Sequence, residues 1–359
     1  MNGRKIYSDI AAEGFDCALF LDEISQYYLS DFYTTDGAVI INSSETSLFT
    51  DARYFEAAEN DKKAGKLSDD VEPHLFTKNI FDTIAEAFVA CSAKKVALDP
   101  SLITVKQLET LKEKCKDISF GYLSDICLKH RKVKTTKEIE KIRKAQSITD
   151  KAFSHIIGFI NENRTELEIA AELEYFMRCN GAGGLAFETI AVSGKNSSLP
   201  HGVPTDNKLV KNAFLTMDYG AKFSGYCSDM TRTVVLGKAD EEMKKIYNTV
   251  LLAQSEAIKF IKAGVSCASA DKIARDVISD AGYGEYFSHS LGHSLGLEIH
   301  ESPALSPRCN DILVPGNIVT VEPGIYIPGK YGVRIENMVL VTENGCENLT
   351  NSDRSLIEI

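Results

Sequence analysis

Two segments of this chain each carry a pair of carboxylates placed symmetrically about a turn, and this pattern constrains the fold most. In residues 214–236, two β-rich runs flank a Lys-Phe-Ser-Gly turn, and the midpoint of Asp218 and Asp229 falls inside it. We therefore expect the two carboxylates opposite each other on one face of a hairpin, where like charges repel. A divalent cation between them would remove that penalty. The alternative is a pair of solvated surface aspartates.

A second segment, residues 318–341, repeats the arrangement. Two apolar runs surround a Pro/Gly-rich turn, and Gly329 is the midpoint of Glu322 and Glu336. Both glutamates lie at or within otherwise apolar strands, where an unpaired carboxylate is costly. The pattern predicts a second hairpin whose two carboxylates face each other.

Histidines are concentrated between the two hairpins. His289, His293 and His300 fall within twelve residues, and glycines near His293 indicate a close approach of the backbone. This segment has no His-Glu-x-x-His zinc motif, and a fourth histidine, His201, stands in a loop-like context. Two Asp, two Glu and one His form an oxygen-rich ligand set that suits two divalent ions better than one.

Composition narrows the classes of function. The 359 residues include 40 basic and 51 acidic ones, a net charge of −11, which argues against nucleic acid as the main partner. No apolar run approaches the ~18 residues of a membrane helix, and the N-terminus does not resemble a secretory signal. The nine scattered cysteines form no Cys-x-x-Cys pair, which favours reduced thiols in a cytoplasmic protein.

The order of predicted elements indicates two domains. Strands expected over 17–21, 38–41 and 96–98 and helices over 54–59 and 105–116 give an α/β domain of residues 1–128. A basic run, residues 129–134, favours a solvated linker over 129–137. The remainder, 138–359, alternates helices and strands in an α+β pattern. Its first two helices are expected to begin at capping boxes, and two more are expected over 241–262 and 270–281.

Taken together, these segments resemble the pita-bread metallopeptidases, specifically the branch of Xaa-Pro aminopeptidases and Xaa-Pro dipeptidases (prolidases), over nearly the whole chain. The motifs that carry the resemblance are Met217-Asp218-Tyr-Gly, Ser228-Asp229-Met-Thr-Arg-Thr, Gly292-His293, Leu297-Glu-Ile-His300-Glu, Val321-Glu322-Pro-Gly-Ile-Tyr and Val333-Arg334-Ile-Glu336. It implies a creatinase-like α/β N-terminal domain followed by an α+β pita-bread catalytic domain. One departure is Ser294, where the family often has glycine.

The resemblance also implies roles for individual residues. The metal ligands would be Asp218, Asp229, His293, Glu322 and Glu336, with Asp229 and Glu336 shared between two divalent ions. Manganese is the first choice for these ions, and cobalt, iron or zinc would also suit the ligands. Glu322 would also act as the proton acceptor, and His201 and His300 would stabilise the oxyanion and assist the leaving nitrogen. His289, Arg334 and Tyr326 would line the site or support its carboxylates.

The implied substrates are proline-containing peptides, and the implied assembly is a homodimer. Some dipeptidases of this branch carry an arginine shortly after the His-Glu pair, but here Ser302, Pro303 and Ala304 follow Glu301. We therefore expect an aminopeptidase, with the dipeptidase as the alternative.

Two other classes of function are less compatible with the sequence. Residues 324–331 nearly match a phosphate-binding loop, but Tyr331 stands where a small hydroxyl residue is needed. A non-catalytic binding module on the same fold would be expected to have lost ligands, and all five are present.

Overall fold

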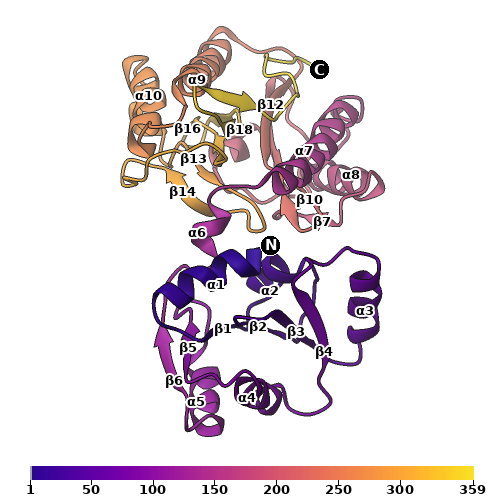
Figure 1. The fold of residues 1–359 in the computed structure, drawn as a ribbon. Coiled ribbons are helices and arrows are strands. Elements are labelled where there is room, and N and C mark those ends of the chain that lie inside the picture. Colours follow the sequence, from indigo (N-terminus) through magenta and orange to yellow (C-terminus); the bar gives the residue numbers. More distant parts are fainter. Residues whose placement is uncertain (1) are drawn as a thin grey trace. The chain divides into compact units, whose positions relative to one another are not determined.

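The computed structural model describes residues 2–359, which form two compact units (Figure 1). One unit ends at Arg131, and the other runs from Lys132 to Ile359. Each has its own sheets and its own apolar core. Within the described residues, no helix combines the length and the hydropathy that a membrane span requires.

The first unit is built on a six-stranded mixed sheet in the order β4-β3-β2-β1-β5-β6. Cys17 and Leu19 of the central strand β1 pack with Ile84 and Phe88 of α4, while α1 and α2 lie on the other side of the sheet (Figure 1). The strands are β1 (Cys17–Phe20), β2 (Ala38–Ile41), β3 (Thr46–Thr50), β4 (Val71–Leu75), β5 (Lys95–Leu98) and β6 (Ser119–Tyr122). The helices are α1 (Asn2–Ala12), α2 (Glu23–Ser30), α3 (Phe55–Lys63), α4 (Ile80–Ala90), α5 (Val105–Lys114) and α6 (Leu128–Arg131). The three strands and two helices predicted here are confirmed, with small shifts at their ends.

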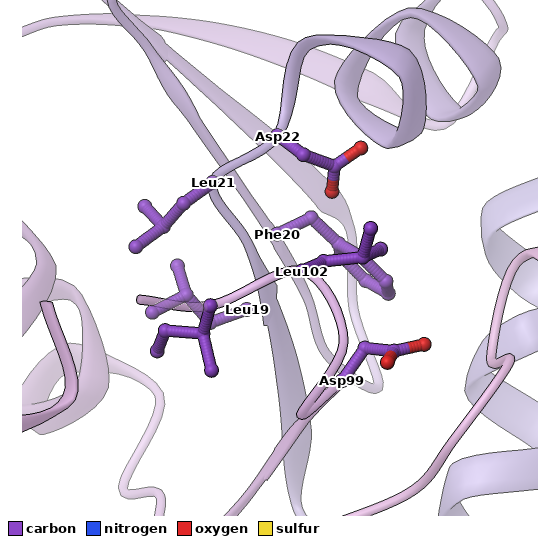
Figure 2. Close-up of a pocket in the computed structure, with 7 residues that line it drawn as sticks. Leu19, Phe20, Leu21, Asp22, Asp99 and Leu102 are labelled. Atoms are coloured by element: carbon purple, nitrogen blue, oxygen red, sulfur yellow. The ribbon is translucent and has the colours of Figure 1, made fainter. Parts of the chain in front are cut away.

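A small pocket lies at the C-terminal end of β1. Figure 2 shows Asp22 and Asp99 on one side of it and Leu19 and Leu21 on the other. Its cavity of about 10 Å³ has room for roughly one water molecule. Asp22 caps α2 by accepting a hydrogen bond from the Ser25 amide, and Asp99 accepts one from the Ser101 amide. Both aspartates are thus engaged in local turns, and the pocket is too small for a substrate.

The second unit combines two helix pairs with several antiparallel sheets. The helices are α7 (Thr136–Ile156), α8 (Glu166–Cys179), α9 (Glu241–Phe260) and α10 (Cys267–Asp280), with 3-10 turns η1 (Gly194–Ser198) and η2 (Gly284–Tyr286). The strands are β7 (Gly184–Leu185), β8 (Ile190–Ser193), β9 (Ala213–Tyr219), β10 (Ala221–Phe223), β11 (Tyr226–Cys227), β12 (Met230–Leu236), β13 (Gly292–Ser294), β14 (Glu301–Leu305), β15 (Ile318–Val321), β16 (Gly324–Ile327), β17 (Tyr331–Arg334), β18 (Asn337–Val341) and β19 (Cys346–Asn348).

Each helix pair buries its apolar face against a different part of the β structure. Ile148 of α7 and Leu173 of α8 share a core with Met217 of β9. In the same way, Ile246 of α9 and Ala274 of α10 belong to a second core that includes strands β15 and β18. Several of the predicted metal ligands lie on or next to strands that contribute to these two cores.

The starts of the first two helices follow from their sequence. Thr135 and Glu138 form a capping box at α7, and Thr165 and Glu168 form one at α8, as predicted. In each box the threonine hydroxyl accepts from a backbone amide of the first turn, and the glutamate accepts from the amide of the threonine. These contacts satisfy donors that the helix itself leaves unpaired.

The first carboxylate-bearing hairpin forms, but its register differs from the prediction. Phe223 pairs with Tyr226, so the turn is Ser224-Gly225, and both turn residues have positive φ values of 46° and 77°. Along β9 and β12, Asp218 therefore pairs with Thr231. Asp229 lies two residues before Thr231, so the two aspartates are diagonal neighbours on one face. The expectation that they stand directly opposite each other was wrong, because the tight turn at Ser224-Gly225 centres the hairpin one residue further along.

The second hairpin has the predicted register. Val321 pairs with Asn337 in β15 and β18, and Gly324 pairs with Arg334 in β16 and β17. The two strand pairs have the same register, and in this register Glu322 and Glu336 lie opposite each other. The two glutamates occupy the gap between the paired stretches, and Gly329 at the turn has a φ of 72°.

The basic run before α7 is not uniformly solvated, contrary to expectation. The side chains of Lys134 and Glu301 are each 1% exposed, and Lys134 Nζ lies 3.1 Å from Glu301 Oε2. Arg131 is also buried, whereas Lys132 is partly exposed and pairs with Asp311. Buried and exposed side chains thus occur within one basic run. The number of charges in the run does not show which of them are buried.

Candidate metal centre

Five side chains from five strand ends converge in the second unit, and we call them the acidic centre. Their places in the fold are Asp218 in β9, Asp229 just before β12, His293 in β13, Glu322 just after β15 and Glu336 just before β18. Apolar strand residues on both sides anchor each position in the two cores. The backbone therefore brings these polar groups together, and the contacts described below orient them.

Ligand atoms of the acidic centre lie close to one another. His293 Nε2 is 3.5 Å from Asp229 Oδ2 and 3.3 Å from Glu322 Oε1. One atom from each of Asp229, His293 and Glu336 lies within 4.8 Å of the others, a spacing that could hold a metal ion. All five residues that the sequence proposed as ligands thus come from the same small region.

The hydrogen bonds of His293 leave one nitrogen available. Its Nδ1 is 3.1 Å from the carbonyl oxygen of Ser294, which can only accept, so Nδ1 carries the proton. Burial lowers the pKa of His293, which favours the neutral ring. The lone pair of Nε2 consequently faces the carboxylates, as a metal ligand requires.

The carboxylates of the acidic centre are destabilised as anions. Burial, followed by the charge of Glu336, raises the pKa of Asp229 well above its usual range. Burial, followed by the charge of Glu322, does the same for the pKa of Glu336. Burial also raises the pKa of Glu322 to about 8. Protein contacts alone therefore do not compensate the negative charge gathered here.

Arg334 and Thr231 support the carboxylates from behind. Arg334 Nη2 donates to Asp218 Oδ2 over 2.7 Å, and Arg334 Nε donates to Thr231 Oγ1 over 2.9 Å. Thr231 in turn donates to Glu336 Oε2 over 2.7 Å. This series of hydrogen bonds orients one carboxylate from each hairpin, Asp218 and Glu336. Arg334 thus supports both carboxylates, one directly and one through Thr231.

A second chain of hydrogen bonds runs from Arg334 to His289. Arg334 Nη1 donates to the Tyr326 hydroxyl over 2.6 Å, and that hydroxyl lies 2.9 Å from His289 Nε2. Because His289 Nδ1 donates to the carbonyl of Ser290, Nε2 accepts from Tyr326. Burial and then the charge of Arg334 lower the pKa of His289 to about 4, so the ring is neutral.

His300 and His201 lie beside these groups and are more exposed. The rings of His293 and His300 are edge to face, with centroids 4.4 Å apart. The pKa of His300 is lowered mainly by burial, and the charges of His293 and then His201 lower it further. The charge of His201 also contributes to the lowered pKa of His289. His201 therefore lies close enough to His289 and to His300 to interact with both electrostatically, and we call the region around these three histidines the polar space.

Sequence reasoning missed three residues that support this site. Thr231 links the two hairpins, Thr320 Oγ1 donates to Glu322 Oε1, and Arg232 donates to the backbone oxygens of Glu336 and Thr231. Thr231 was in fact signalled, since it lies two residues after Asp229 on the same strand face. The contacts of Thr320 and Arg232 depend on the tertiary fold.

The oxygen atoms of the acidic centre fit a cation. Within the described residues, Asp218 Oδ1, Asp229 Oδ1 and Glu336 Oε1 are buried and have no hydrogen-bond partner. Buried polar atoms are normally paired, so three such oxygens around one histidine need a positively charged ligand. Oxygen donors with a single nitrogen suit manganese and other divalent ions of similar chemistry.

Comparison with known proteins agrees with this geometry. Residues 140–343 match the family described as Metallopeptidase family M24, and residues 4–133 match the Creatinase/Prolidase N-terminal domain. The chain belongs to metallopeptidase family M24. The predicted family and the predicted creatinase-like and pita-bread folds are thereby confirmed, and the chain is a metallo-exopeptidase.

Relatives of this M24 chain match it over nearly its full length. A Xaa-Pro dipeptidase from Pyrococcus furiosus is 38% identical over 99% of both chains. Among solved structures, a Xaa-Pro dipeptidase from Bacillus anthracis is 40% identical with a TM-score of 0.94, over 100% of this chain and 99% of the other. An X-Pro aminopeptidase from Thermotoga maritima is 36% identical with a TM-score of 0.93, over 100% of both.

Proposed function

We propose that this chain removes the N-terminal residue from peptides whose second residue is proline, with two divalent metal ions in the acidic centre. The observation that carries the proposal is the set of buried carboxylate oxygens without partners beside the Nε2 of His293. The preference for proline is supported by the names of the relatives, which are Xaa-Pro dipeptidases and an X-Pro aminopeptidase.

The proposed ligands are Asp218, Asp229, His293, Glu322 and Glu336, with Asp229 and Glu336 shared between the two ions. Divalent ions there would polarise the scissile carbonyl and lower the pKa of water. We propose manganese as the native ion, and cobalt, iron or zinc would also suit the ligand chemistry.

Glu322 is the proposed proton acceptor. Its side chain is 16% exposed, so it combines burial with access from the polar space. Thr320 fixes one of its oxygens through a hydrogen bond of 3.1 Å. Glu322 would take a proton from the attacking water as the peptide carbonyl is attacked.

His201 and His300 are the proposed groups that contact the reacting carbonyl and the leaving nitrogen. Both are exposed to the polar space, so a substrate can reach them. An N–H group of either ring can donate to an oxyanion and can pass a proton to the prolyl nitrogen. His289 and Tyr326 would shape the pocket, because their hydrogen bonds to each other and to Arg334 hold both in place.

The choice between aminopeptidase and dipeptidase rests on one local feature. Residues 302–304, which follow the His300-Glu301 pair, include no basic side chain that could bind the C-terminal carboxylate of a dipeptide. This favours an aminopeptidase that accepts longer peptides. The dipeptidase remains the second candidate, because similar relatives carry that name.

We also propose a cytoplasmic homodimer with domains at residues 1–128 and 138–359 and a linker at 129–137. All nine cysteines are free thiols, which is typical of a reducing compartment. The residues matched by the two families, 4–133 and 140–343, support a boundary in this region. The dimer rests on the family resemblance alone.

A kinetic comparison tests the proposal. The protein is stripped with a chelator, reloaded with manganese or cobalt, and assayed on Xaa-Pro dipeptides and on tripeptides of the same first two residues. We expect metal-dependent cleavage of tripeptides at the Xaa-Pro bond. Turnover confined to dipeptides would overturn the aminopeptidase assignment, and no turnover with any of the metals would overturn the Xaa-Pro peptidase proposal.

A further inference from the structure

A buried carboxylate outside the acidic centre, that of Glu166, gathers hydrogen-bond donors from both ends of one loop. Glu166 opens α8 directly after the capping residue Thr165 and is 1% exposed. At the near end of the loop, the Ser193 amide donates to Oε1 over 2.6 Å, and Asn196 Nδ2 lies 3.2 Å from both oxygens. At the far end, the Thr205 amide and hydroxyl donate to Oε2 over 3.0 and 2.6 Å.

The backbone at the start of α8 completes this closure. The Glu166 amide donates to the carbonyl of Asn207, and the Leu167 amide donates to that of Thr205. Residues 193–205 are thus closed into a loop whose two ends meet at one carboxylate. We call this segment the His201 loop, because His201 stands near its tip.

Apolar packing contributes little to the tip of the His201 loop. Leu199 is 57% exposed and Val203 is 77% exposed, so neither side chain anchors the tip in a core. The tip is instead held by a polar contact, since Arg334 Nη1 donates to the carbonyl of Pro200 over 3.2 Å. The loop position therefore depends on hydrogen bonds at its base, at its tip and between them, where the Gly332 amide donates to Ser197 Oγ over 3.0 Å.

We propose that Glu166 is a positioning residue that acts through His201. It touches neither the acidic centre nor any proposed substrate group in the contacts described above. Instead it fixes both ends of the loop that carries His201, and Arg334 ties the tip to Asp218. This inference rests on the proposed role of His201 in peptide hydrolysis.

The chemistry at Glu166 makes the proposal easy to test. Every group that faces its two oxygens is a donor, so a glutamine at this position would turn an amide N–H₂ toward other donors. Glu166→Gln keeps the size and replaces one of the two acceptor oxygens with a donor. Glu168→Gln is the matched control, because Glu168 lies on the same turn, is exposed, and belongs to a capping box that accepts glutamine.

The first measurement is steady-state kinetics of metal-loaded protein on a Xaa-Pro tripeptide. We expect Glu166→Gln to lower kcat by about 10–100-fold while KM changes little, since a displaced catalytic group costs rate rather than ground-state binding. The metal content should equal that of the wild type, because no ligand lies on this loop. Glu168→Gln should keep the wild-type kcat. A kcat of Glu166→Gln within twofold of the wild type would overturn the proposal.

The second measurement is a double-mutant cycle with His201→Ala. If Glu166 acts through His201, adding Glu166→Gln to His201→Ala should lower kcat no further. Additive losses would overturn the proposal, because Glu166 would then act through another group. If His201→Ala alone kept the wild-type kcat, the role proposed for His201 would fail, and the inference about Glu166 would fail with it. The metal-dependent cleavage of Xaa-Pro bonds by the wild type would still stand.

The third measurement needs no activity. Trypsin cleaves after lysine and arginine, and Lys195 is exposed near the base of this loop, so release of the base should speed nicking after Lys195 in metal-free Glu166→Gln, and not in Glu168→Gln. Equal nicking rates in the two variants would contradict the closure by Glu166. If Glu166→Gln does not fold, Thr205→Val replaces it, since it removes the hydroxyl donor and keeps the shape of the side chain. The same kcat loss and the same faster nicking are expected from it, at smaller size, and their absence would overturn the proposal.

Discussion

The second unit contains two kinds of buried carboxylate, which differ in whether hydrogen-bond donors and cations lie beside their oxygens. Glu166 and Glu301 are buried and meet donors, namely backbone amides, hydroxyls and the ammonium group of Lys134. Asp229 and Glu336 are equally buried, yet each has an oxygen without a hydrogen-bond partner within the described residues. Burial alone therefore does not mark a functional site. A group of several uncompensated carboxylates does, whereas a single one does not, since Asp22 in the first unit also has a buried oxygen without a partner among residues 2–359.

The two kinds of carboxylate also differ in the charges of their neighbours. At the acidic centre, burial and neighbouring carboxylates raise the pKa values of Asp229 and Glu336, so each anion makes the next less favourable. Around Glu301 the neighbours are donors, with Lys134 Nζ and the Glu298 amide 3.1 and 3.2 Å from its oxygens. Removal of one charge should therefore have opposite effects on the stability of the two sites.

The largest effect is expected from Asp229→Asn. The amide is a poor bridging ligand, so the cleavage of Xaa-Pro peptides should fall by at least about 10³-fold, which corresponds to ~4 kcal/mol of transition-state stabilisation. In metal-free protein at pH 8, the same change should raise the melting temperature, because it removes one of several repelling carboxylates. Activity and melting temperature, measured on the same preparation, check both outcomes.

Asp280→Asn is the control for this variant. Asp280 is exposed at the end of α10, so neither activity nor melting temperature should change. A lower melting temperature of metal-free Asp229→Asn would show that the acidic centre contributes stability without a cation. The proposed contrast between the two kinds of carboxylate would then be wrong.

The next effect concerns the compensated carboxylate. Lys134→Met should lower the free energy of unfolding by about 3–5 kcal/mol, because it leaves Glu301 as a buried charge without its cation. Lys132→Met provides a matched control, since the exposed pair of Lys132 and Asp311 contributes about 0–1 kcal/mol. Chemical denaturation of the three proteins measures these differences.

A second substitution sharpens this prediction. Glu301→Gln in the Lys134→Met background should recover part of the lost stability, because a neutral amide costs less to bury than an unpaired anion. No recovery would indicate that the loss came from packing around the lysine stem, and the electrostatic contrast with Asp229→Asn would no longer hold.

The acidic centre was largely predictable from local sequence because hairpins have simple symmetry. Glu322 and Glu336 are equidistant from Gly329, and their register was predicted correctly. The partner of Asp218 was off by two residues, because the centre of the turn lies one residue further along, where Ser224 adopts a positive φ that is uncommon for a residue other than glycine. With Gly225 it makes a two-residue turn, where a longer one was expected.

The contacts that support the site could not be predicted from the sequence, because they join distant parts of the chain. Arg232 donates to the backbone of Ser352 and Asp353, some 120 residues away, and no local pattern announces this. Glu166 stands inside a recognised capping box, in which the sequence pointed to Glu168 alone. A carboxylate in the first turn of a helix is common for electrostatic reasons, so its partners could be found only in the folded protein.

The smallest effect is a pH dependence that only the uncompensated site should show. The pKa of Glu322 is about 8 in the folded protein, raised by burial from its ordinary value of 4.5. Between these values, the unfolded chain releases a proton that the folded, metal-free protein keeps. The contribution of Glu322 to the stability of metal-free protein therefore falls as the pH rises from about 4.5 to 8, by ~1 kcal/mol for each pH unit.

Bound divalent ions should cancel this slope, because they stabilise the ionised carboxylates. Between pH 6 and pH 7, the melting temperature of metal-free protein should drop by about 2–4 °C relative to that of the manganese-loaded protein. Glu322→Gln should reduce the difference in slope, because Asp229 and Glu336, whose pKa values are also raised, keep their own contributions, while Glu168→Gln should leave it intact. Parallel melting curves for metal-free and metal-loaded protein across this range would mean that the carboxylates already have compensation within the chain, and Asp229 and Glu301 would then belong to the same class.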